Sequence, residues 1–357
     1  MLSRRLTLAA PALAGLPRIA AAQYRREDAE AQIVIVAPAG GADTVPSAQD
    51  LVVRLGAPAR VHAETARGII ECAGRVNERP SAVAAILPSV ALAYMMQSGL
   101  PERLVYALRS IAQIGVSELH VLASQRIGDI RDLAGLKVNF GPHGSPTEAT
   151  AAVLLERIPL RVDPLYLDHA QALAAVMRGQ IPAMMLLAPK PIALFSGFNA
   201  LDAVHFLQVD EAAVRLSGLL PAQLLPADYK LTGGRPIGTA AVPLVLACFN
   251  WSASTPMFMG LAWLADLLDE RGSGLRGFNM PAAVQGWDRF PPVADWLAGG
   301  RQGTILDVAL GRRQAPAPSP VPDQQPTPLH GAPATAGTQA EQKAKLFQQF
   351  LEWQRKQ

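Results

Sequence analysis

Short apolar runs alternate with amphipathic segments from Gln32 to about Leu310. Apolar runs bounded by polar or turn residues predict buried strands, and the segments between them predict helices. The predicted strands are residues 33–36, 82–87, 105–108, 119–123, 137–140, 183–187, 204–207 and 241–248. The predicted helices are residues 65–75, 90–97, 146–157, 169–178, 211–217 and 256–268. This alternation predicts an α/β fold, with a largely parallel sheet and helices on its faces.

Two of the predicted helices have well-formed start signals. Ser145 can cap the helix that follows it, Pro146 suits the first helical position, and Glu148 stands three residues after the cap. Asp168 and Gln171 repeat this capping-box spacing before the next helix.

Residues 236–265 carry no charge, which raises the question of a membrane span. Pro243, Asn250 and Pro256 interrupt the stretch, and a span needs about 20 continuous apolar residues. A strand followed by a helix that starts at Pro256 explains the stretch better. We therefore expect no membrane-spanning segment in the mature protein.

The first 22 residues have the layout of a secretory signal. Arg4 and Arg5 precede an uncharged stretch, and Ala20–Ala22 provide small residues for cleavage after Ala22. The uncharged stretch is too short for a membrane anchor. We predict a signal peptide over residues 1–22 and a periplasmic location.

Composition narrows the function further. The chain has 357 residues, 50% hydrophobic and 17% charged, which is enough for two domains with buried cores. Its net charge of +3 falls to 3 − 3 = 0 once Arg4, Arg5 and Arg18 are removed with the signal. The lack of a basic excess in the mature chain argues against nucleic acid as a partner.

The chain changes character after Arg313. Seven prolines lie between Gln314 and Ala334, so residues 314–340 are expected to form an extended linker. Residues 341–357 are expected to form an amphipathic helix with Leu346, Phe350 and Trp353 on one face. Docking of this helix on its own globular body is the favoured reading, and a partner-binding helix is the alternative.

The segment from Gly141 to Glu148 is the strongest candidate for ligand binding, because it joins a predicted strand to a capped helix. In open α/β sheets ligands bind beyond the carboxyl ends of the strands. Two glycines allow close approach of the backbone, and the amides of residues 145–148 at the helix start suit a carboxylate. A glycine turn whose serine only caps its helix is an equally good explanation. Glu148 would repel an anion, so we expect it to fold back on the cap.

The sequence lacks recognisable catalytic and metal-binding motifs. Its six histidines show no HExxH pattern and no i,i+4 pair, so no metal site and no cofactor is predicted. Ser145 is followed by proline and stands outside a GxSxG elbow, and His120 in an apolar strand is expected to be a core residue. We therefore expect no enzymatic activity. Whether Cys72 and Cys248 pair is left open.

A series of motifs follows in order along the chain, at residues 108–112, 119–123, 132–138, 141–149, 166–167, 170–185, 239–246 and 286–296. In this order the motifs, over about residues 83–298, resemble the TAXI family of solute-binding proteins of TRAP transporters. The resemblance implies a two-lobed type II periplasmic-binding-protein fold with a central ligand cleft. Pro146 and Pro182 depart from the family pattern, in which a glycine and an aspartate are usual.

The resemblance also implies a division of the chain and a set of ligand contacts. The first lobe would comprise residues 23–123 and 238–313, and the second lobe residues 124–237. The expected ligand-binding residues are Pro88, Ser89, Gly141, His143, Gly144, Ser145, Thr147, Ala188 and Pro189.

The function expected from the resemblance is periplasmic capture of a small organic anion, an amino acid or a carboxylate, for delivery to the membrane permease of a TRAP transporter. Two alternatives stay open. One is a receptor of the same fold that serves an ABC transporter, and the other is an interaction module that kept the fold.

Overall fold

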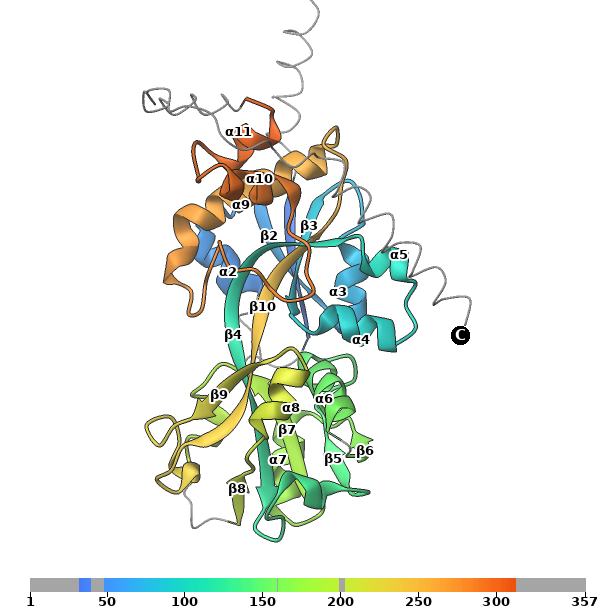
Figure 1. The fold of residues 1–357 in the computed structure, drawn as a ribbon, viewed down its shortest axis with the longest axis vertical. Coiled ribbons are helices and arrows are strands. Elements are labelled where there is room, and N and C mark those ends of the chain that lie inside the picture. Colours follow the sequence, from blue (N-terminus) through green and yellow to red (C-terminus); the bar gives the residue numbers. More distant parts are fainter. Residues whose placement is uncertain (1–31, 40–47, 159, 199–202, 313–357) are drawn as a thin grey trace, which may run out of the picture. The chain divides into compact units, whose positions relative to one another are not determined.

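The computed structural model describes residues 32–39, 48–158, 160–198 and 203–312 (Figure 1). The predicted signal peptide, the Pro-rich linker and the C-terminal helix lie outside the described residues. Every described residue falls within a single compact unit.

The first lobe contains three parallel strands, with β1 between the other two. They are β1 (Ile33–Pro38), β2 (Val61–Ala66) and β3 (Ala82–Pro88). The helices of this lobe are α2 (Ala48–Leu55), α3 (Ile69–Arg75), α4 (Ala91–Gln97), α5 (Glu102–Val105), α9 (Pro256–Arg271), α10 (Pro291–Ala298) and α11 (Ile305–Ala309), with a short 3-10 turn η4 (Gly272–Gly274).

The second lobe has the same kind of layering, with β5 between β6 and β7 in parallel. Its strands are β5 (Lys137–Asn139), β6 (Asp163–Leu165), β7 (Ala183–Ala188), β8 (Val204–Phe206) and β9 (Leu220–Leu224). Its helices are α6 (Pro146–Arg157), α7 (His169–Met177) and α8 (Glu211–Leu216), with 3-10 turns η1 (Ile130–Leu133), η2 (Ala193–Phe195) and η3 (Lys230–Thr232).

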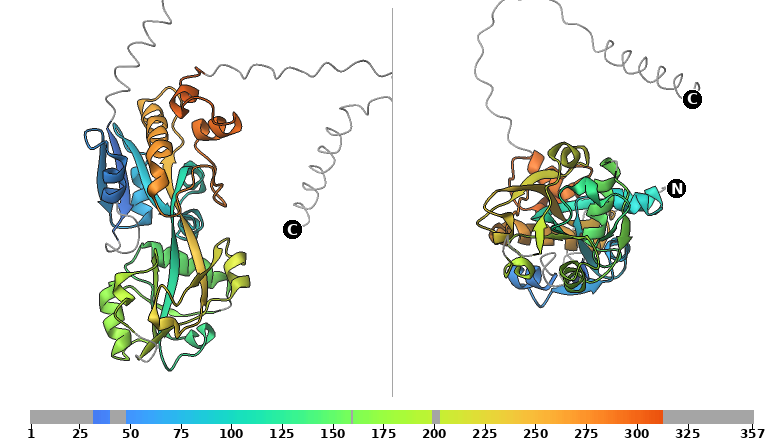
Figure 2. Two further views of the ribbon diagram at one scale, coloured as in Figure 1. Left: turned by 90° about the vertical axis from the view of Figure 1, so that its left-hand side faces the viewer. Right: turned by 90° about the horizontal axis from the view of Figure 1, so that it is seen from below.

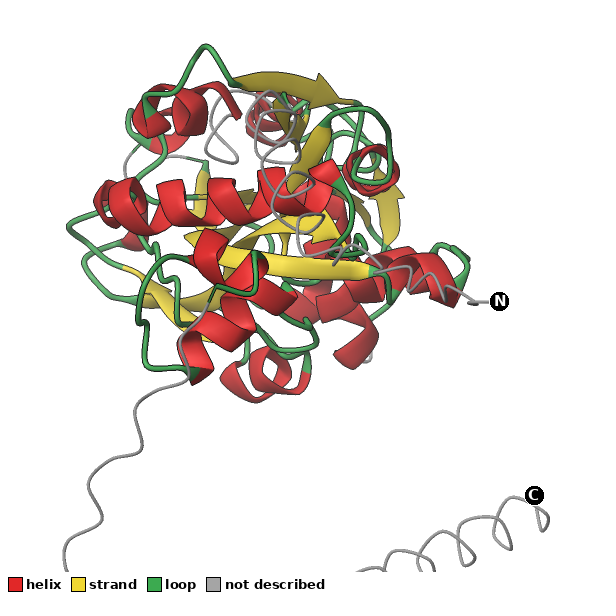
Figure 3. Ribbon diagram, turned by 90° about the horizontal axis from the view of Figure 1, so that it is seen from above, coloured by secondary structure: helices red, strands yellow, loops and turns green. Residues whose placement is uncertain are grey.

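Two long strands run through both lobes and join them (Figures 1 and 2). They are β4 (Leu108–Ser124) and β10 (Ile237–Phe249), which pair antiparallel with each other. In the first lobe β10 pairs with β3, and in the second β4 pairs with β7, which gives the order β2-β1-β3-β10-β4-β7-β5-β6. Helices cover both faces of this sheet (Figure 3). The predicted two-lobed α/β fold is confirmed. The prediction of a largely parallel sheet is wrong, because the crossing strands pair antiparallel with each other and with β3 and β7, which makes the sheet mixed.

The buried apolar side chains form three clusters around the sheet. One cluster runs along one face through both lobes and includes residues of α3, α4 and α6. The other two lie on the opposite face, one in each lobe. Cys72 and Cys248 are buried in different clusters and unpaired, and burial raises the pKa of the Cys72 thiol to about 12.

The most informative wrong prediction concerns the crossing strands. Residues 105–108 were predicted as a separate strand, but Val105 ends helix α5 and β4 begins at Leu108. Strand β4 has 17 residues and includes the whole of the predicted strand 119–123, whereas only Leu108 of the predicted strand 105–108 belongs to it. Two register shifts against β10 allow this long strand to follow the curled sheet.

Helix 65–75 was predicted too long, because residues 61–66 form strand β2 and the helix begins at Ile69. The exposed His62, Glu64 and Thr65 on this edge strand hid its pattern. Within the described ranges, no helix is long and apolar enough to cross a membrane.

Candidate functional site: a ligand-binding site where the lobes meet

Strands β3 and β7, one from each lobe, end beside the middle of the two crossing strands. On the first-lobe side, Pro88 at the end of β3 pairs with Leu244, and the Ser89 amide donates to the Pro243 carbonyl at 2.8 Å. On the second-lobe side, Ala188 at the end of β7 pairs with Glu118 of β4. The segments that leave β3 and β7 therefore flank the two crossing strands from opposite sides.

The predicted binding turn follows β5 and begins α6. Gly141 and Gly144 have φ values of 75° and 76°, which are costly for residues with a side chain. A Cβ at Gly141 would overlap the ring of His169, so the turn packs directly against α7. The Gly144 carbonyl accepts a 2.9 Å hydrogen bond from the amide of Ile69 in the first lobe. The turn is thus in backbone contact with the opposite lobe.

Ser145 and Thr147 use their hydroxyls inside the second lobe. Ser145 Oγ accepts from the Glu148 amide at 3.2 Å, as the predicted cap requires, and donates to the Phe140 carbonyl at 3.4 Å. Thr147 Oγ1 accepts from the Leu187 amide of β7 at 3.0 Å. Both residues are buried. In this structure the Ser145 hydroxyl bonds to the residue after β5, and the Thr147 hydroxyl bonds to β7.

The carboxylate of Glu148 folds back on the turn, as expected. It accepts from the Gly144 amide, one residue earlier than a regular capping box, and lies 3.2 Å from Nδ1 of the exposed His143. Burial and the Glu148 charge raise the pKa of Tyr94 to about 12 and that of Tyr166 in the same direction. A buried negative charge, surrounded by two phenols and an imidazole, therefore stands at the start of α6.

The amides expected to receive an anion are largely engaged. The Ser145 amide donates to the Pro142 carbonyl, the Glu148 amide donates to Ser145 Oγ, and Pro146 has no N–H. The Gly144 amide donates to the Glu148 carboxylate. A ligand carboxylate at this helix start must therefore compete with the side chain of Glu148.

A second buried carboxylate, that of Glu118 in β4, links the lobes on the opposite face. Its Oε1 accepts from Arg276 of the first lobe at 2.8 Å, and its Oε2 accepts from the Lys190 amide of the second lobe at 3.0 Å. Burial is the largest influence and raises the pKa of Glu118 despite both cations. The Lys190 ammonium pairs with Asp228 at 2.8 Å.

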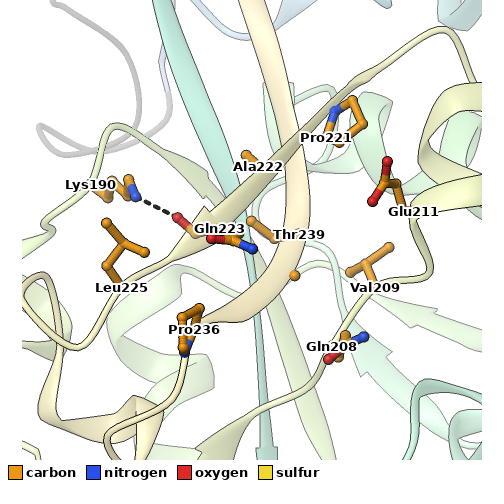
Figure 4. A pocket seen from close by; sticks show the side chains of 11 residues that line it. Lys190, Gln208, Val209, Glu211, Pro221, Ala222, Gln223, Leu225, Pro236 and Thr239 are labelled. Carbon is orange, nitrogen blue, oxygen red and sulfur yellow. Dashed lines mark hydrogen bonds between the residues drawn. The ribbon is translucent and has the colours of Figure 1, made fainter.

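A pocket of about 570 Å³ lies beside this network in the second lobe (Figure 4). It is walled by β9, β10 and residues 208–211, and the Lys190 ammonium reaches the Gln223 carbonyl at its edge. The pocket offers an ammonium from Lys190, a carboxylate from Glu211 and the amides of Gln208 and Gln223.

The predicted site residues thus fall into two groups. Pro88, Ser89, Ala188 and Pro189 flank the crossing strands, and the turn residues Gly141, His143, Gly144, Ser145 and Thr147 begin α6 beside them. Their role in ligand binding stays a prediction.

Sequence reasoning missed several polar residues of the same region. Tyr94 and Tyr166 surround Glu148, and the indole of Trp287 donates to the Ser89 carbonyl at 2.8 Å. Ser117 and Glu118 lie on β4 between the two flanking segments. A Ser-Glu pair directly before the predicted strand 119–123 was the available signal for the last two.

His120 is a buried core residue, as expected, with Nε2 at 2.8 Å from the Tyr229 hydroxyl. Among the described residues, no group of three potential metal ligands comes together.

Three solved structures illustrate what the chain is similar to. A TctC solute-binding protein from Polaromonas is 13% identical, with a TM-score of 0.38, over 79% of this chain and 99% of that one. The periplasmic binding protein BugD is 12% identical, with a TM-score of 0.40, over 78% and 96%. MatC from Rhodopseudomonas palustris, solved with bound malate, is 15% identical, with a TM-score of 0.39, over 78% and 98%.

No curated protein matches the sequence. A family model described as the NMT1-like family matches residues 51–252, which is more than half of the chain and includes both crossing strands. The chain belongs to the NMT1-like family.

Proposed function

We propose that the protein is a periplasmic solute-binding receptor that captures a small organic anion and delivers it to the permease of a TRAP-type transporter. The observation that carries the proposal is the convergence of the segments after β3 and β7 on the two crossing strands. A sheet that continues through two lobes lets them move relative to each other, while the strand ends form a binding surface between them. The predicted signal peptide supports the periplasmic location.

Capture by such a receptor is a shift between open and closed states. A solute that contacts both lobes binds the closed state more tightly and so favours closure. The bond between the Ile69 amide and the Gly144 carbonyl is one contact that closure makes. The segments around Ser89 and Gly144 would then hold the solute from opposite sides.

The charge of Glu148 favours one kind of ligand among the small organic anions. Its buried carboxylate lies at the turn where an anion would bind, and a dianion there meets a like charge. An amino acid brings an ammonium group that can pair with Glu148 and a carboxylate for the remaining donors. We therefore favour an amino acid over a dicarboxylate.

The test is thermal unfolding of the chain from Gln23 onward with matched solutes. L-glutamate is compared with glutarate, and L-alanine with propionate, so that each pair differs by the amino group. A solute at 100 times its Kd adds about 2.7 kcal/mol, which raises the midpoint by several degrees. We expect the amino acid of at least one pair to give the larger shift.

Other outcomes separate the alternatives. Equal shifts of the unfolding midpoint within each pair would contradict the preference for an amino acid but would still support the receptor function. The absence of any shift, with no co-purified solute in mass spectrometry, would overturn the receptor function and favour the interaction module.

A further inference from the structure

We propose that the hydroxyl of Ser117 on β4 is a direct ligand contact at the centre of the surface between the lobes. This inference rests on the proposed receptor function and adds a specific contact to it. The hydroxyl would donate a hydrogen bond to an oxygen of the bound solute.

Sheet register places Ser117 midway between the two flanking segments. Ser117 pairs with Val242 of β10, next to Pro243, whose carbonyl accepts the Ser89 amide. On its other side Glu118 pairs with Ala188, the last residue before Pro189. Adjacent strands lie about 4.8 Å apart, so both flanking segments are within a few strand widths of Ser117.

Strand alternation places the Ser117 side chain on the face of β4 that the binding turn covers. Residues 117, 119, 121 and 123 share one face, and the pairing of β4 is regular over this stretch. Leu119, Val121 and Ala123 pack in the cluster that also contains Ala149 of α6, Tyr94 of α4 and Trp287. Thr147 binds the Leu187 amide, and Leu187 pairs with Leu119.

The hydroxyl of Ser117 differs from its neighbours in having no partner. It is fully buried, and Oγ makes no hydrogen bond to any residue in the part of the chain that the structure describes. Other buried hydroxyls are bonded: Thr239 donates to the Leu119 carbonyl, and Ser110 of the same strand donates to the Asp288 backbone carbonyl at 3.4 Å. An unpaired buried hydroxyl destabilises the folded state. The presence of Ser117 at this position is explained if its hydroxyl donates a hydrogen bond to a bound solute.

Access to Ser117 requires the lobes to separate. Gly68 and Gly144 bring the backbones of the two lobes into contact, and Tyr94 of the first lobe approaches Glu148 of the second. Separation along this boundary opens the face on which Ser117 lies. A solute that enters there is enclosed when the lobes close again.

The first experiment compares Ser117→Ala with Ser110→Ala in calorimetric titrations with L-glutamate, L-alanine, glutarate and propionate. Removing one hydrogen bond to the solute should weaken the affinity of Ser117→Ala for the tightest-binding probe about three- to tenfold. Without probe its unfolding midpoint should stay the same or rise, because no bond of the protein is lost. Ser110→Ala should keep the affinity of the unchanged protein.

Unchanged affinity of Ser117→Ala for a probe that the unchanged protein binds would overturn the inference but not the receptor function. If the unchanged protein binds no probe and carries no co-purified solute, the receptor function fails, and the inference fails with it.

A second variant tests access without any solute. Ser117→Cys should react with a small methanethiosulfonate reagent under native conditions, whereas the buried Cys72 and Cys248 of the unchanged protein should stay unmodified. The probe that raises the unfolding midpoint most should slow the reaction several-fold. A cysteine at position 117 that stays unreactive in a folded variant would show that the hydroxyl is a permanent core group and overturn the inference.

Discussion

Single residues at the binding turn show how narrowly its backbone is constrained. Gly141 needs both a positive φ and the absence of a side chain, because His169 packs against its Cα. Gly135 has a similar φ of 71°, but a Cβ there would meet no atom within 4 Å. A comparison of the two positions therefore distinguishes the cost of a positive φ from the cost of steric overlap.

Gly141→Ala should destabilise the protein more than Gly135→Ala. Both changes place alanine at a positive φ, at a cost of about 1–2 kcal/mol. Gly141→Ala adds overlap with the His169 ring, which should cost about 1–3 kcal/mol more. Urea unfolding of both variants measures the difference. Equal losses would show that the His169 ring or helix α7 moves away from the turn at no cost.

His120 is a residue whose burial makes stability depend on pH. Burial lowers its pKa from 6.5 to about 4, so it stays neutral in the fold while the unfolded chain takes up a proton below about pH 6.5. The contribution of neutral His120 to the free energy of unfolding is complete above pH 6.5 and is lost as the pH falls towards 4. The loss should reach roughly 3 kcal/mol.

The measurement is the free energy of unfolding between pH 7.5 and 4.5 for the unchanged protein and for His120→Gln. Acidic residues titrate in both proteins, so the difference between the two curves isolates His120. We expect the variant to lose less stability on acidification, whatever its stability at neutral pH. Parallel curves would contradict a depressed pKa.

At the scale of elements, local chemistry made some features predictable. Ser145 and Pro146 begin α6 as predicted, because a cap acts through the few amides next to it. Helix α2 was not predicted, although its buried positions 48, 51, 52 and 55 have a helical spacing in the sequence.

Other elements depend on distant partners and could not be predicted locally. Strand β4 runs on past Gly115 because β10, more than 100 residues later, pairs with it across two register shifts. The Arg276–Glu118 bond likewise joins residues 158 positions apart. The predicted site residues lie near one another. The polar residues Ser117 and Glu118 between them could be recognised only from the pairing of the folded sheet.

Ser145→Ala tests the cap of α6 separately from ligand binding. The lost bond to the Glu148 amide should cost about 0.5–2 kcal/mol of unfolding free energy. Because Ser145 is buried and bonded within its own lobe, its replacement should change the affinity for L-glutamate less than Ser117→Ala does. Chemical denaturation and calorimetry give the two values. A large loss of affinity at unchanged stability would instead make Ser145 a ligand contact.

At the scale of the molecule, the lobes touch through a few specific bonds. Ile69 bonds to Gly144, Gln97 bonds to Glu156 at 2.5 Å, and Arg276 donates to the Lys190 carbonyl. One apolar cluster also continues through both lobes on the face of α4 and α6. For the proposed receptor, we therefore expect the balance between open and closed states to depend on how closely the backbones at Gly68 and Gly144 approach.

Gly68→Ala should shift this balance towards the open state. Gly68 has an extended backbone with φ of −175°, so alanine is not strained there, but its Cβ would lie 2.8 Å from the Gly144 carbonyl oxygen. That atom belongs to the backbone of the other lobe and cannot rotate away. The lobes must separate to admit the methyl group, which also weakens the Ile69–Gly144 bond. Gly74→Ala, within helix α3 that begins directly after Gly68, is the control, because a Cβ there meets nothing within 4 Å.

The separation can be measured with nitroxide labels at Val53→Cys in the first lobe and Leu216→Cys in the second, whose side chains are 69% and 70% exposed. Cys72 and Cys248 are buried and should remain unlabelled. Electron resonance should give a longer or broader distance distribution for Gly68→Ala than for the labelled parent, and an unchanged one for Gly74→Ala. The affinity for L-glutamate should fall in step, since a more open receptor must use binding energy to close. An unchanged distance in a folded Gly68→Ala variant would mean that the Gly144 turn yields locally and that this contact does not control the lobes.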